Sequence, residues 1–430
     1  MASESHGISS ASKLYNEVLR SIDYTFNTAV GDLIDNSIEA GASRIFIECD
    51  INAMTVAIVD NGAGMREATH IEAMKVASKS RNYSGSDLGK FGSGLKFASL
   101  SQCRKLTVAT RSQDTEVISS RVIDLDHIAQ HDDLGKVVEK ADVASLPLWA
   151  VRMIEEAPGT IVFWEAIDKV FLSEEEGIRS RQDVMRAHLA ELEEYLSVTF
   201  SRFIKGEVPE RASLELYLNG NLVEAWDPFL LRFKETKVFP ALVVPFEGSQ
   251  ITVTGHVLPG KRQLDILGKY EHAKAGRGRW PANQGFWVFR QGRLIRGGGW
   301  LGLTNSSDPH TQLARVAFEF PSALDHALQL PVDKSNIQLP KSLVNELRDY
   351  VRAVISEANE RYRSQSKIAS PSDLTGGLGS SRPIVRKASA RTLAMALEKI
   401  ANQKGLSPYL ETLKVELKTQ NSALADEIGW

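Results

Sequence analysis

The chain has 430 residues, of which 43% are hydrophobic and 24% charged, a composition that is ordinary for a globular protein and excludes global disorder. The formal charge of −3 does not point to nucleic acid or an anionic membrane as partner of the whole molecule. Cys49 and Cys103 are the only cysteines, and the chain has no CxxC pair and no His cluster at metal spacing, so neither a disulfide framework nor a zinc site is supported.

The start of the chain, residues 1–13, lacks the apolar core of a signal peptide, and no run of about 18 apolar residues follows. We therefore expect a cytoplasmic protein. Apolar residues at helical spacing then predict two opening helices, around 14–22 and 29–40. Gly41 is suited to end the second helix in a left-handed conformation.

Polar residues on the second helix form one stripe, which consists of Asp32, Asp35, Asn36 and Glu39. A carboxylate there can orient and deprotonate water, and an amide oxygen can complete the shell of a magnesium ion. The alternative is an ordinary solvated helix face.

Two buried strands are predicted at 44–50 and 55–60, and the second runs directly into a glycine-rich turn. That turn reads Asp60-Asn61-Gly62-Ala63-Gly64-Met65. Its carboxylate can accept a hydrogen bond from an exocyclic amine, and its glycines allow close approach of the backbone to a ligand. Ordinary turn chemistry is the alternative.

After a helical stretch around 71–77, the segment 78–94 is dense in serine and glycine, which predicts a mobile lid. Its end opens a helix and reads Gly89-Lys90-Phe91-Gly92-Ser93-Gly94-Leu95-Lys96. Backbone N–H groups and the helix dipole can face phosphates there, and Lys96 can add charge unless its register points it at solvent. The loop is not a Walker A loop, because the GK[ST] ending is absent.

Further strands are predicted at 106–110, 117–125 and 160–164. They do not alternate regularly with helices as in a βαβ fold, so the predicted class is α+β. A helix over 181–203 leads to a hairpin with Asn219-Gly220 at its turn, which we take as the start of a second domain.

The second domain is predicted to contain a hairpin over 286–297 with Gln291-Gly292 at its turn, a strand at 314–320 and a closing helix at 341–363. A linker rich in serine, glycine and proline follows, and then two short helices. The expected domains are 1–210, 211–363, a linker at 364–384, and a helical hairpin or tail at 385–430.

The order of these motifs resembles the ATP-binding boxes of the GHKL superfamily, which includes gyrase, large ATP-dependent heat-shock chaperones, histidine kinases and MutL. The segments DLIDNSIEAGA, DNGAGM and LGKFGSGLKFAS are similar to three boxes, and Gly159-Thr160 is similar to the fourth. Within the superfamily the chain is most similar to MORC ATPases and their bacterial MORC-like relatives, from about Ser12 to Leu339. The segments that carry this similarity include GKFGSGLKFASLSQCRKLTVAT and LNGNLVEAWDPF.

The resemblance implies a GHKL-type two-layer α/β sandwich, a smaller transducer-type α/β domain and a C-terminal helical tail. It also implies that Asn36 holds Mg²⁺, that Asp60 binds the adenine amine with Thr160 nearby, and that the loop from Gly89 to Lys96 wraps the phosphates. The implied nucleotide-binding residues are Asn36, Asp60, Gly62, Gly64, Met65, Lys79, Gly89, Lys90, Phe91, Gly92, Ser93, Gly94, Leu95, Lys96 and Thr160.

The implied catalytic residues are Asp32 and Lys334. The family usually has glutamate as general base where this chain has Asp32, which is one methylene shorter, so slow hydrolysis is expected. Lys334 is the candidate for the transducer lysine that contacts the γ-phosphate, although a surface lysine is the alternative. Gln284 and Asp333 are weaker candidates that we expect to be structural.

The segment 256–300 contains nine Lys or Arg residues against Asp265 and Glu271, with aromatic residues between them. Such a segment can contact a nucleic-acid backbone, and an equally simple alternative is a solvated hairpin beside acidic neighbours. The expected function is an ATPase clamp that forms a homodimer when ATP binds and encloses DNA or a partner protein.

An ATP-gated interaction module without significant turnover is the alternative function. The C-terminal helices are a possible site for a partner protein, and bacterial relatives resemble components of restriction or phage-defence loci. No membrane association is expected.

Overall fold

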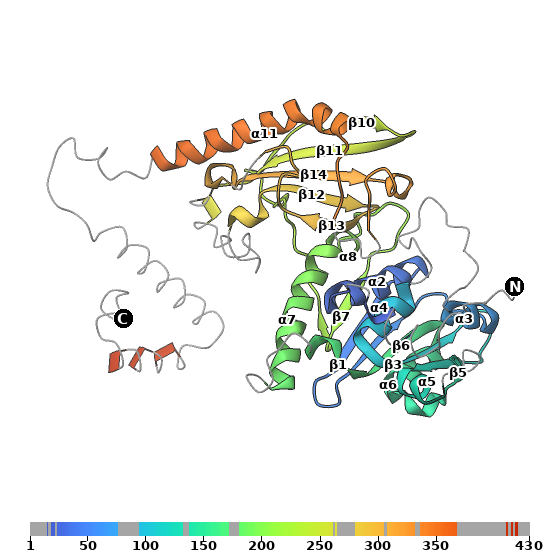
Figure 1. The fold of residues 1–430 in the computed structure, drawn as a ribbon. Coiled ribbons are helices and arrows are strands. Elements are labelled where there is room, and N and C mark those ends of the chain that lie inside the picture. Colours follow the sequence, from blue (N-terminus) through green and yellow to red (C-terminus); the bar gives the residue numbers. More distant parts are fainter. Residues whose placement is uncertain are drawn as a thin grey trace, which may run out of the picture. The chain divides into compact units, whose positions relative to one another are not determined.

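The computed structural model describes residues 15, 19–21, 24–75, 94–131, 137–171, 180–260, 263–264, 280–304, 308–331, 336–367, 410–411, 414–415 and 418–419. The chain divides into two compact units, Met1–Gln365 and Ser366–Trp430. The first unit contains two β-sheets with their helices (Figure 1). The predicted helices of the tail lie almost entirely outside the described residues.

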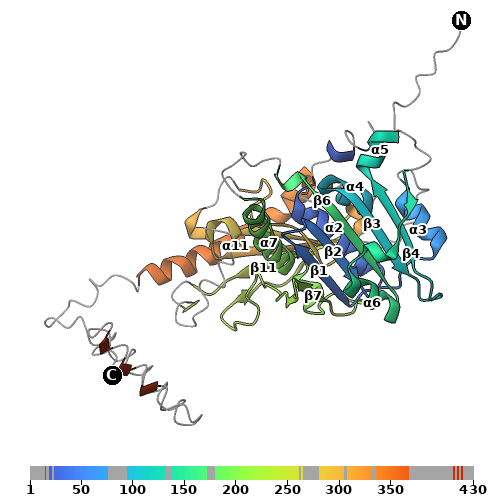
Figure 2. The same ribbon diagram turned by 90° about the horizontal axis from the view of Figure 1, so that it is seen from below.

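The first sheet has eight strands in the order β5-β4-β3-β6-β2-β1-β7-β8. Neighbouring strands are antiparallel except β1 and β7, which are parallel, and Figure 2 shows the central strands side by side. The strands are β1 (Arg44–Asp50), β2 (Thr55–Asp60), β3 (Cys103–Arg111), β4 (Ser119–Asp124), β5 (Glu139–Lys140), β6 (Gly159–Ile167), β7 (Glu215–Leu218) and β8 (Asn221–Leu222).

Helices cover this sheet, and the principal core lies between one of its faces and α2, α4 and α7. A smaller core on the other face packs against α6. The helices are α2 (Phe26–Glu39), α3 (Glu67–Met74), α4 (Gly94–Gln102), α5 (Leu125–His131), α6 (Leu148–Glu156), α7 (Arg181–Thr199) and α8 (Ser201–Ile204). The short 3-10 helices of this part are η2 (Leu19–Ser21), η4 (Val143–Ser145) and η5 (Lys169–Phe171).

The second sheet has six strands, five of them in the order β10-β11-β14-β12-β13, and β9 pairs with β11. The strands are β9 (Lys237–Val238), β10 (Leu242–Phe246), β11 (Ser249–Val257), β12 (Gly285–Arg290), β13 (Arg293–Gly297) and β14 (Ala314–Phe320). The short 3-10 helices are η6 (Trp280–Asn283), η7 (Pro309–Thr311) and η8 (Ser322–Leu324).

The long helix α11 (Lys341–Lys367) packs on the second sheet through Leu343, Leu347, Val351 and Val354, which recur every three or four residues. The α+β class predicted from the sequence is therefore confirmed, with two sheets and separate helical layers.

Both predicted hairpin turns are present, and the residues of each turn have positive φ, as a tight two-residue turn requires. The hairpin at Asn219-Gly220, however, does not belong to the second sheet. Its strands β7 and β8 extend the first sheet, because β7 pairs in parallel with β1. The chain thus changes sheets after Leu222, not at residue 211 as the sequence suggested. Alternating apolar residues predicted the hairpin, but strand partnership depends on tertiary contacts.

Candidate nucleotide site

The acidic stripe lies on α2, which begins with a reciprocal cap. The Thr25 hydroxyl accepts a hydrogen bond from the Thr28 N–H, and the Thr28 hydroxyl accepts one from the Thr25 N–H. Within the helix Asp32 is 4% exposed and Asp35 is 1% exposed, and Asn36 is half-buried. The two carboxylates are therefore not part of an ordinary solvated helix face.

The side chain of Asp32 lies against the start of α4, where the glycine-rich segment ends. A Cβ placed on Gly94 would lie 3.4 Å from Asp32 Oδ2. The Tyr24 hydroxyl donates a hydrogen bond of 2.8 Å to the same oxygen. The acidic stripe and the N-terminus of α4 consequently face each other, as the sequence-based account requires.

The Asp60 carboxylate lies at the end of β2 and is 7% exposed. It accepts hydrogen bonds from the Ser37 hydroxyl (2.8 Å) and from the Gly62 N–H (2.9 Å). Burial raises the pKa of Asp60, and the hydrogen bonds from Gly62, Ser37 and the Thr160 backbone oppose that rise. This is a buried, oriented acceptor, and α2 supplies part of its support.

The turn after Asp60 is held close to the rest of the first sheet. Gly64 has a φ of +64°, and a Cβ there would lie 2.0 Å from the carbonyl oxygen of Arg111. A Cβ on Gly62 would lie 2.8 Å from that of Ala40. Both glycines are thus required by the packing of the protein itself, in addition to any approach of a ligand. Met65, the last residue of the motif, is half-buried and packs against the principal core.

Thr160 is placed beside Asp60 by strand pairing, because the two residues are register partners of β6 and β2. The Thr110 hydroxyl lies 3.1 Å from the Thr160 hydroxyl, and it also accepts a hydrogen bond from the Met65 N–H. The sequence-based reasoning missed Thr110 and Ser37 as supports of this region. Ser37 was adjacent to the predicted Asn36, but the position of Thr110 on β3 gave no signal of its own.

Lys96 lies in the first turn of α4. Its side chain is almost fully buried, and its amine donates hydrogen bonds to the carbonyls of Ala73 (2.8 Å) and Lys75 (2.7 Å) at the end of α3. Burial lowers the pKa of Lys96 to about 8. In this structure the amine links α4 to the C-terminal end of α3.

Several predicted site residues lie outside the described part of the chain, namely Lys79, Gly89, Lys90, Phe91, Gly92, Ser93, Asp333 and Lys334. Leu95, in the first turn of α4, packs partly buried against the principal core. Gln284 is buried and accepts a hydrogen bond from the Thr311 hydroxyl, which is the structural role expected for it.

The basic segment 256–300 is described in part. Arg290 and Arg293 are buried, and Arg296 donates a hydrogen bond of 2.7 Å to Asn336. Arg290 pairs with Asp325, and Arg293 pairs with Asp35. Two of the cations counted in this segment therefore lie inside the protein beside carboxylates and do not contribute to a basic surface.

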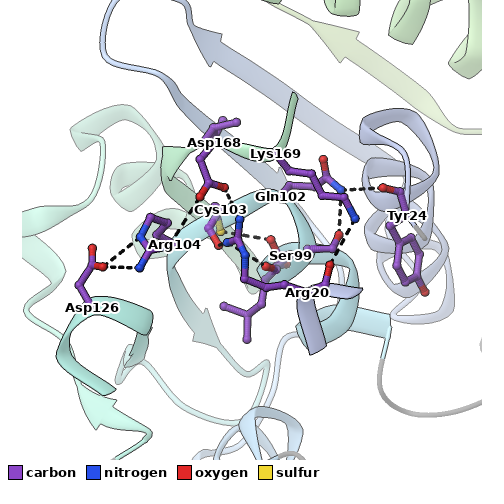
Figure 3. Close-up of polar contacts among 12 residues, drawn as sticks. Arg20, Tyr24, Ser99, Gln102, Cys103, Arg104, Asp126, Asp168 and Lys169 are labelled. Atoms are coloured by element: carbon purple, nitrogen blue, oxygen red, sulfur yellow. Dashed lines mark hydrogen bonds and ion pairs between the residues drawn. The ribbon is translucent and has the colours of Figure 1, made fainter. Parts of the chain in front are cut away.

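The segment before α2 is bound to the same region through contacts that the sequence did not predict (Figure 3). Arg20 forms an ion pair of 2.5 Å with Asp168 and donates a hydrogen bond to the carbonyl of Cys103. Gln102, at the end of α4, donates a hydrogen bond to the carbonyl of Tyr24. These contacts fix the backbone from which the Tyr24 hydroxyl reaches Asp32.

Comparison with known proteins identifies the first part of the chain. Residues 24–160 match the family model of the histidine kinase-, DNA gyrase B- and HSP90-like ATPases. Over 92 residues the chain is 32% identical to the DNA mismatch repair protein MutL of Pelotomaculum thermopropionicum. This aligned region covers 20% of this chain and 15% of that protein. The matched region is thus a small part of that relative.

A solved structure that is similar is that of the ATPase and transducer domains of DNA topoisomerase II from Balamuthia mandrillaris. The TM-score is 0.43 at 11% identity, over 80% of this chain and 86% of that one.

Strands β1 to β5 and helices α2 to α6 lie within residues 24–160, the part of the chain that matches the family model of the histidine kinase-, DNA gyrase B- and HSP90-like ATPases. This part of the chain carries a domain of the GHKL superfamily of ATPases, as its motifs predicted. The predicted fold class, a GHKL-type α/β sandwich followed by a smaller α/β domain, is also confirmed.

Within the described ranges, no helix is both long and apolar enough to cross a membrane. The same ranges contain no group of three or more His, Cys, Asp or Glu side chains that would hold a metal ion. A magnesium ion at this site would instead take an amide oxygen together with phosphate and water oxygens, and half-buried Asn36 on the acidic stripe fits that donor set.

Proposed function

We propose that the chain binds ATP with Mg²⁺ and hydrolyses it slowly. The observation that carries this proposal is the juxtaposition of Asp32 with the N-terminus of α4, where a Cβ on Gly94 would come within 3.4 Å of the carboxylate. An anionic ligand at a helix N-terminus is stabilised by unpaired N–H groups and by the helix dipole. A carboxylate beside that position can accept a proton from an attacking water.

Each part of the nucleotide has a proposed partner. Asp60 accepts a hydrogen bond from the adenine amine, with Thr160 beside it and Ser37 orienting the carboxylate. Asn36 holds Mg²⁺, which would neutralise phosphate charge when bound. The loop from Gly89 to Lys96 encloses the phosphates, and Lys334 contacts the γ-phosphate.

Asp32 is the proposed general base. One of its oxygens accepts a hydrogen bond from Tyr24 and the other lies near Arg293, so the orientation of the carboxylate is set from two directions. Because aspartate reaches about one methylene less far than glutamate, a displacement near 1 Å is expected to lower the rate by about 10²-fold. The shorter side chain of Asp32 is therefore expected to make ATP turnover slow.

ATP binding is proposed to close two copies of the chain into a homodimer clamp on DNA or on a partner protein. A partner protein would bind through the C-terminal helices. A MORC-like role in bacterial defence is the biological context we propose. A nonhydrolysable ATP analogue should raise the dimer fraction in light scattering. An unchanged monomer mass at saturating analogue would remove the clamp from the proposal.

The second candidate function is an ATP-gated interaction module without significant turnover. It is favoured by the engagement of both Asp32 oxygens by side chains of the protein itself. Two variants separate the candidates: Asp32→Asn should abolish steady-state phosphate release, and Asp32→Glu should increase it.

Nucleotide affinity, measured by calorimetry, should stay within about threefold in both variants, because Asn36 and Asp60 are unaltered. Wild-type protein that binds the nucleotide but releases no phosphate supports the interaction module. Protein that binds no nucleotide contradicts both candidates.

A further inference from the structure

Arg293 brings a buried cation from the second sheet to the acidic stripe of the first. It is the first residue of β13 and is 1% exposed. Its Nε lies 2.9 Å from Asp35 Oδ1, and its Nη2 lies 3.7 Å from Asp32 Oδ1. Strand β13 also contacts α7 and α8, and α7 contacts α2 (Figure 1). One guanidinium therefore contacts both carboxylates of the stripe.

The neighbouring sequence leaves space for this arginine. A Cβ on Gly31, in the interior of α2, would lie 2.5 Å from the Tyr195 hydroxyl and 3.2 Å from Arg293 Nη2. Glycine within a helix is destabilising relative to alanine. Here its small size lets the arginine lie against the helix, where Nη2 also donates a hydrogen bond of 3.3 Å to Tyr195.

Arg293 keeps its charge at this buried position. Burial alone lowers its pKa, but Asp35, Tyr195 and Asp32 raise it, and the net pKa lies above the usual value. A permanent cation favours the ionised form of a carboxylate next to it. A general base must be ionised to accept a proton from water.

Arg290 shows what a purely structural pair in the same hairpin looks like. Its Nε and Nη2 donate to the two oxygens of Asp325, at 2.7 and 2.8 Å. Both partners belong to the second sheet region and satisfy each other. Arg293 differs because its carboxylate partners lie on α2, and because one of them is the proposed base.

We propose that Arg293 is a positioning residue: it holds Asp35, orients Asp32 for activation of water, and thereby ties the competence of the nucleotide site to the β12–β13 hairpin. This inference rests on the proposed ATP hydrolysis. The second sheet then acts on the site through a buried arginine, independently of Lys334.

The groups that contact the two carboxylates and carry charge or titrate come from several elements. They include Tyr24 from the segment before α2, Tyr195 from α7 and Arg293 from β13. Arg293 is the cation among these contacts. Removing it should therefore move the acid limb of the pH–rate profile to higher pH.

The test compares Arg293→Met with Arg290→Met, which removes an equally buried arginine three positions away. Phosphate release is measured from pH 5 to pH 9 and corrected for the folded fraction. Arg293→Met should lower kcat by about 10²-fold and change KM for ATP by less than about threefold. The acid limb of its pH–rate profile should shift to higher pH by about one unit. Arg290→Met should leave all three unchanged per folded molecule.

Lysine variants cover the case in which a methionine variant does not fold. Arg293→Lys keeps the charge but loses the planar fork, so kcat should fall by about tenfold while the acid limb stays in place. Arg290→Lys is its control. Equal changes in kcat and KM at positions 293 and 290 would show that Arg293 has only a structural role. An acid limb that does not shift in Arg293→Met would show the same.

The two proposals fail in different ways. Wild-type protein that binds ATP without releasing phosphate removes the positioning role and leaves the binding site intact. Wild-type protein that binds no nucleotide removes both. If the wild type hydrolyses ATP and the variants at position 293 behave like those at position 290, this inference alone is removed.

Discussion

The two sheets of this protein bury charge in different ways. In the second sheet, Arg290 and Asp325 form a bidentate ion pair with two hydrogen bonds. In the first, Asp60 is buried with hydroxyl and backbone donors around it, and Asp32 and Asp35 share the guanidinium of Arg293. Burying a carboxylate without a matched cation is costly, and such groups gather where a protein binds or transforms a ligand. This difference supports the proposal that the first sheet and its helices carry the nucleotide chemistry.

The largest effect, a loss of stability, is expected at the turn after β2 in the first sheet. Gly64→Ala should destabilise the protein by about 3 kcal/mol or more, because the new Cβ would lie 2.0 Å from a backbone oxygen and the positive φ adds strain. Gly41→Ala is the matched control, with a φ of +77° and nothing within 4 Å of its Cβ. It should cost about 1–2 kcal/mol.

Urea denaturation of the two glycine variants measures the difference. Equal losses of stability would mean that the turn of the Asp60 motif is not held against β3 as described.

The second prediction separates the buried carboxylates of the two regions. Asp60→Asn should weaken ATP binding by about 100-fold, because a hydrogen bond to a charged acceptor contributes about 1.5–3 kcal/mol. Asp325→Asn removes a carboxylate of similar burial from the second sheet. It should lower thermal stability and leave the affinity of the folded protein unchanged. Calorimetric titration with ATP gives both affinities, and a similar loss in the two variants would contradict the comparison.

The third prediction concerns a buried histidine of the second sheet. Burial lowers the pKa of His256 to about 4. Between pH 6.5 and pH 4 the unfolded chain therefore binds more protons at this residue than the folded one, and stability falls as the pH is lowered. The contribution is at most about 1.4 kcal/mol per pH unit.

The urea midpoint of the His256→Phe variant should accordingly fall less than that of the wild type over this range. Parallel curves for the two proteins would show that His256 is protonated in the folded state as readily as in the unfolded one.

The smallest expected effect lies at the contact between Tyr24 and Asp32. Tyr24→Phe removes one buried hydrogen bond of 2.8 Å and keeps the ring. We expect kcat to fall by about fivefold, corresponding to about 1 kcal/mol, with little change in KM. Steady-state phosphate release checks this. A change in KM alone would indicate that Tyr24 acts on nucleotide binding and not on the base.

Much of the architecture followed from local sequence patterns. Apolar alternation and the tight turn predicted β12 and β13, and helical spacing predicted α11 on the second sheet. The parallel pairing of β7 with β1 was not predictable in this way, because partner choice is set by long-range packing. That is why the expected boundary at residue 211 differs from the observed change of sheets.

The candidate site was predictable where one segment carries several of its groups. Asp32, Asp35 and Asn36 share one helix stripe, and Asp60 directly follows a strand. Contacts from distant segments had no local signature: Arg293 lies more than 250 residues after Asp35 and read as part of a basic segment. Lys96 was expected near phosphate because it follows a glycine-rich loop, but burial of its amine against α3 was not visible in the sequence.

The most direct test of the account is the structure of this chain crystallised with Mg²⁺ and a nonhydrolysable ATP analogue. We expect the adenine amine at Asp60, the metal on Asn36, and the triphosphate between α2 and the N-terminus of α4. An analogue bound elsewhere, or a triphosphate that does not lie between these two helices, would contradict the central claim.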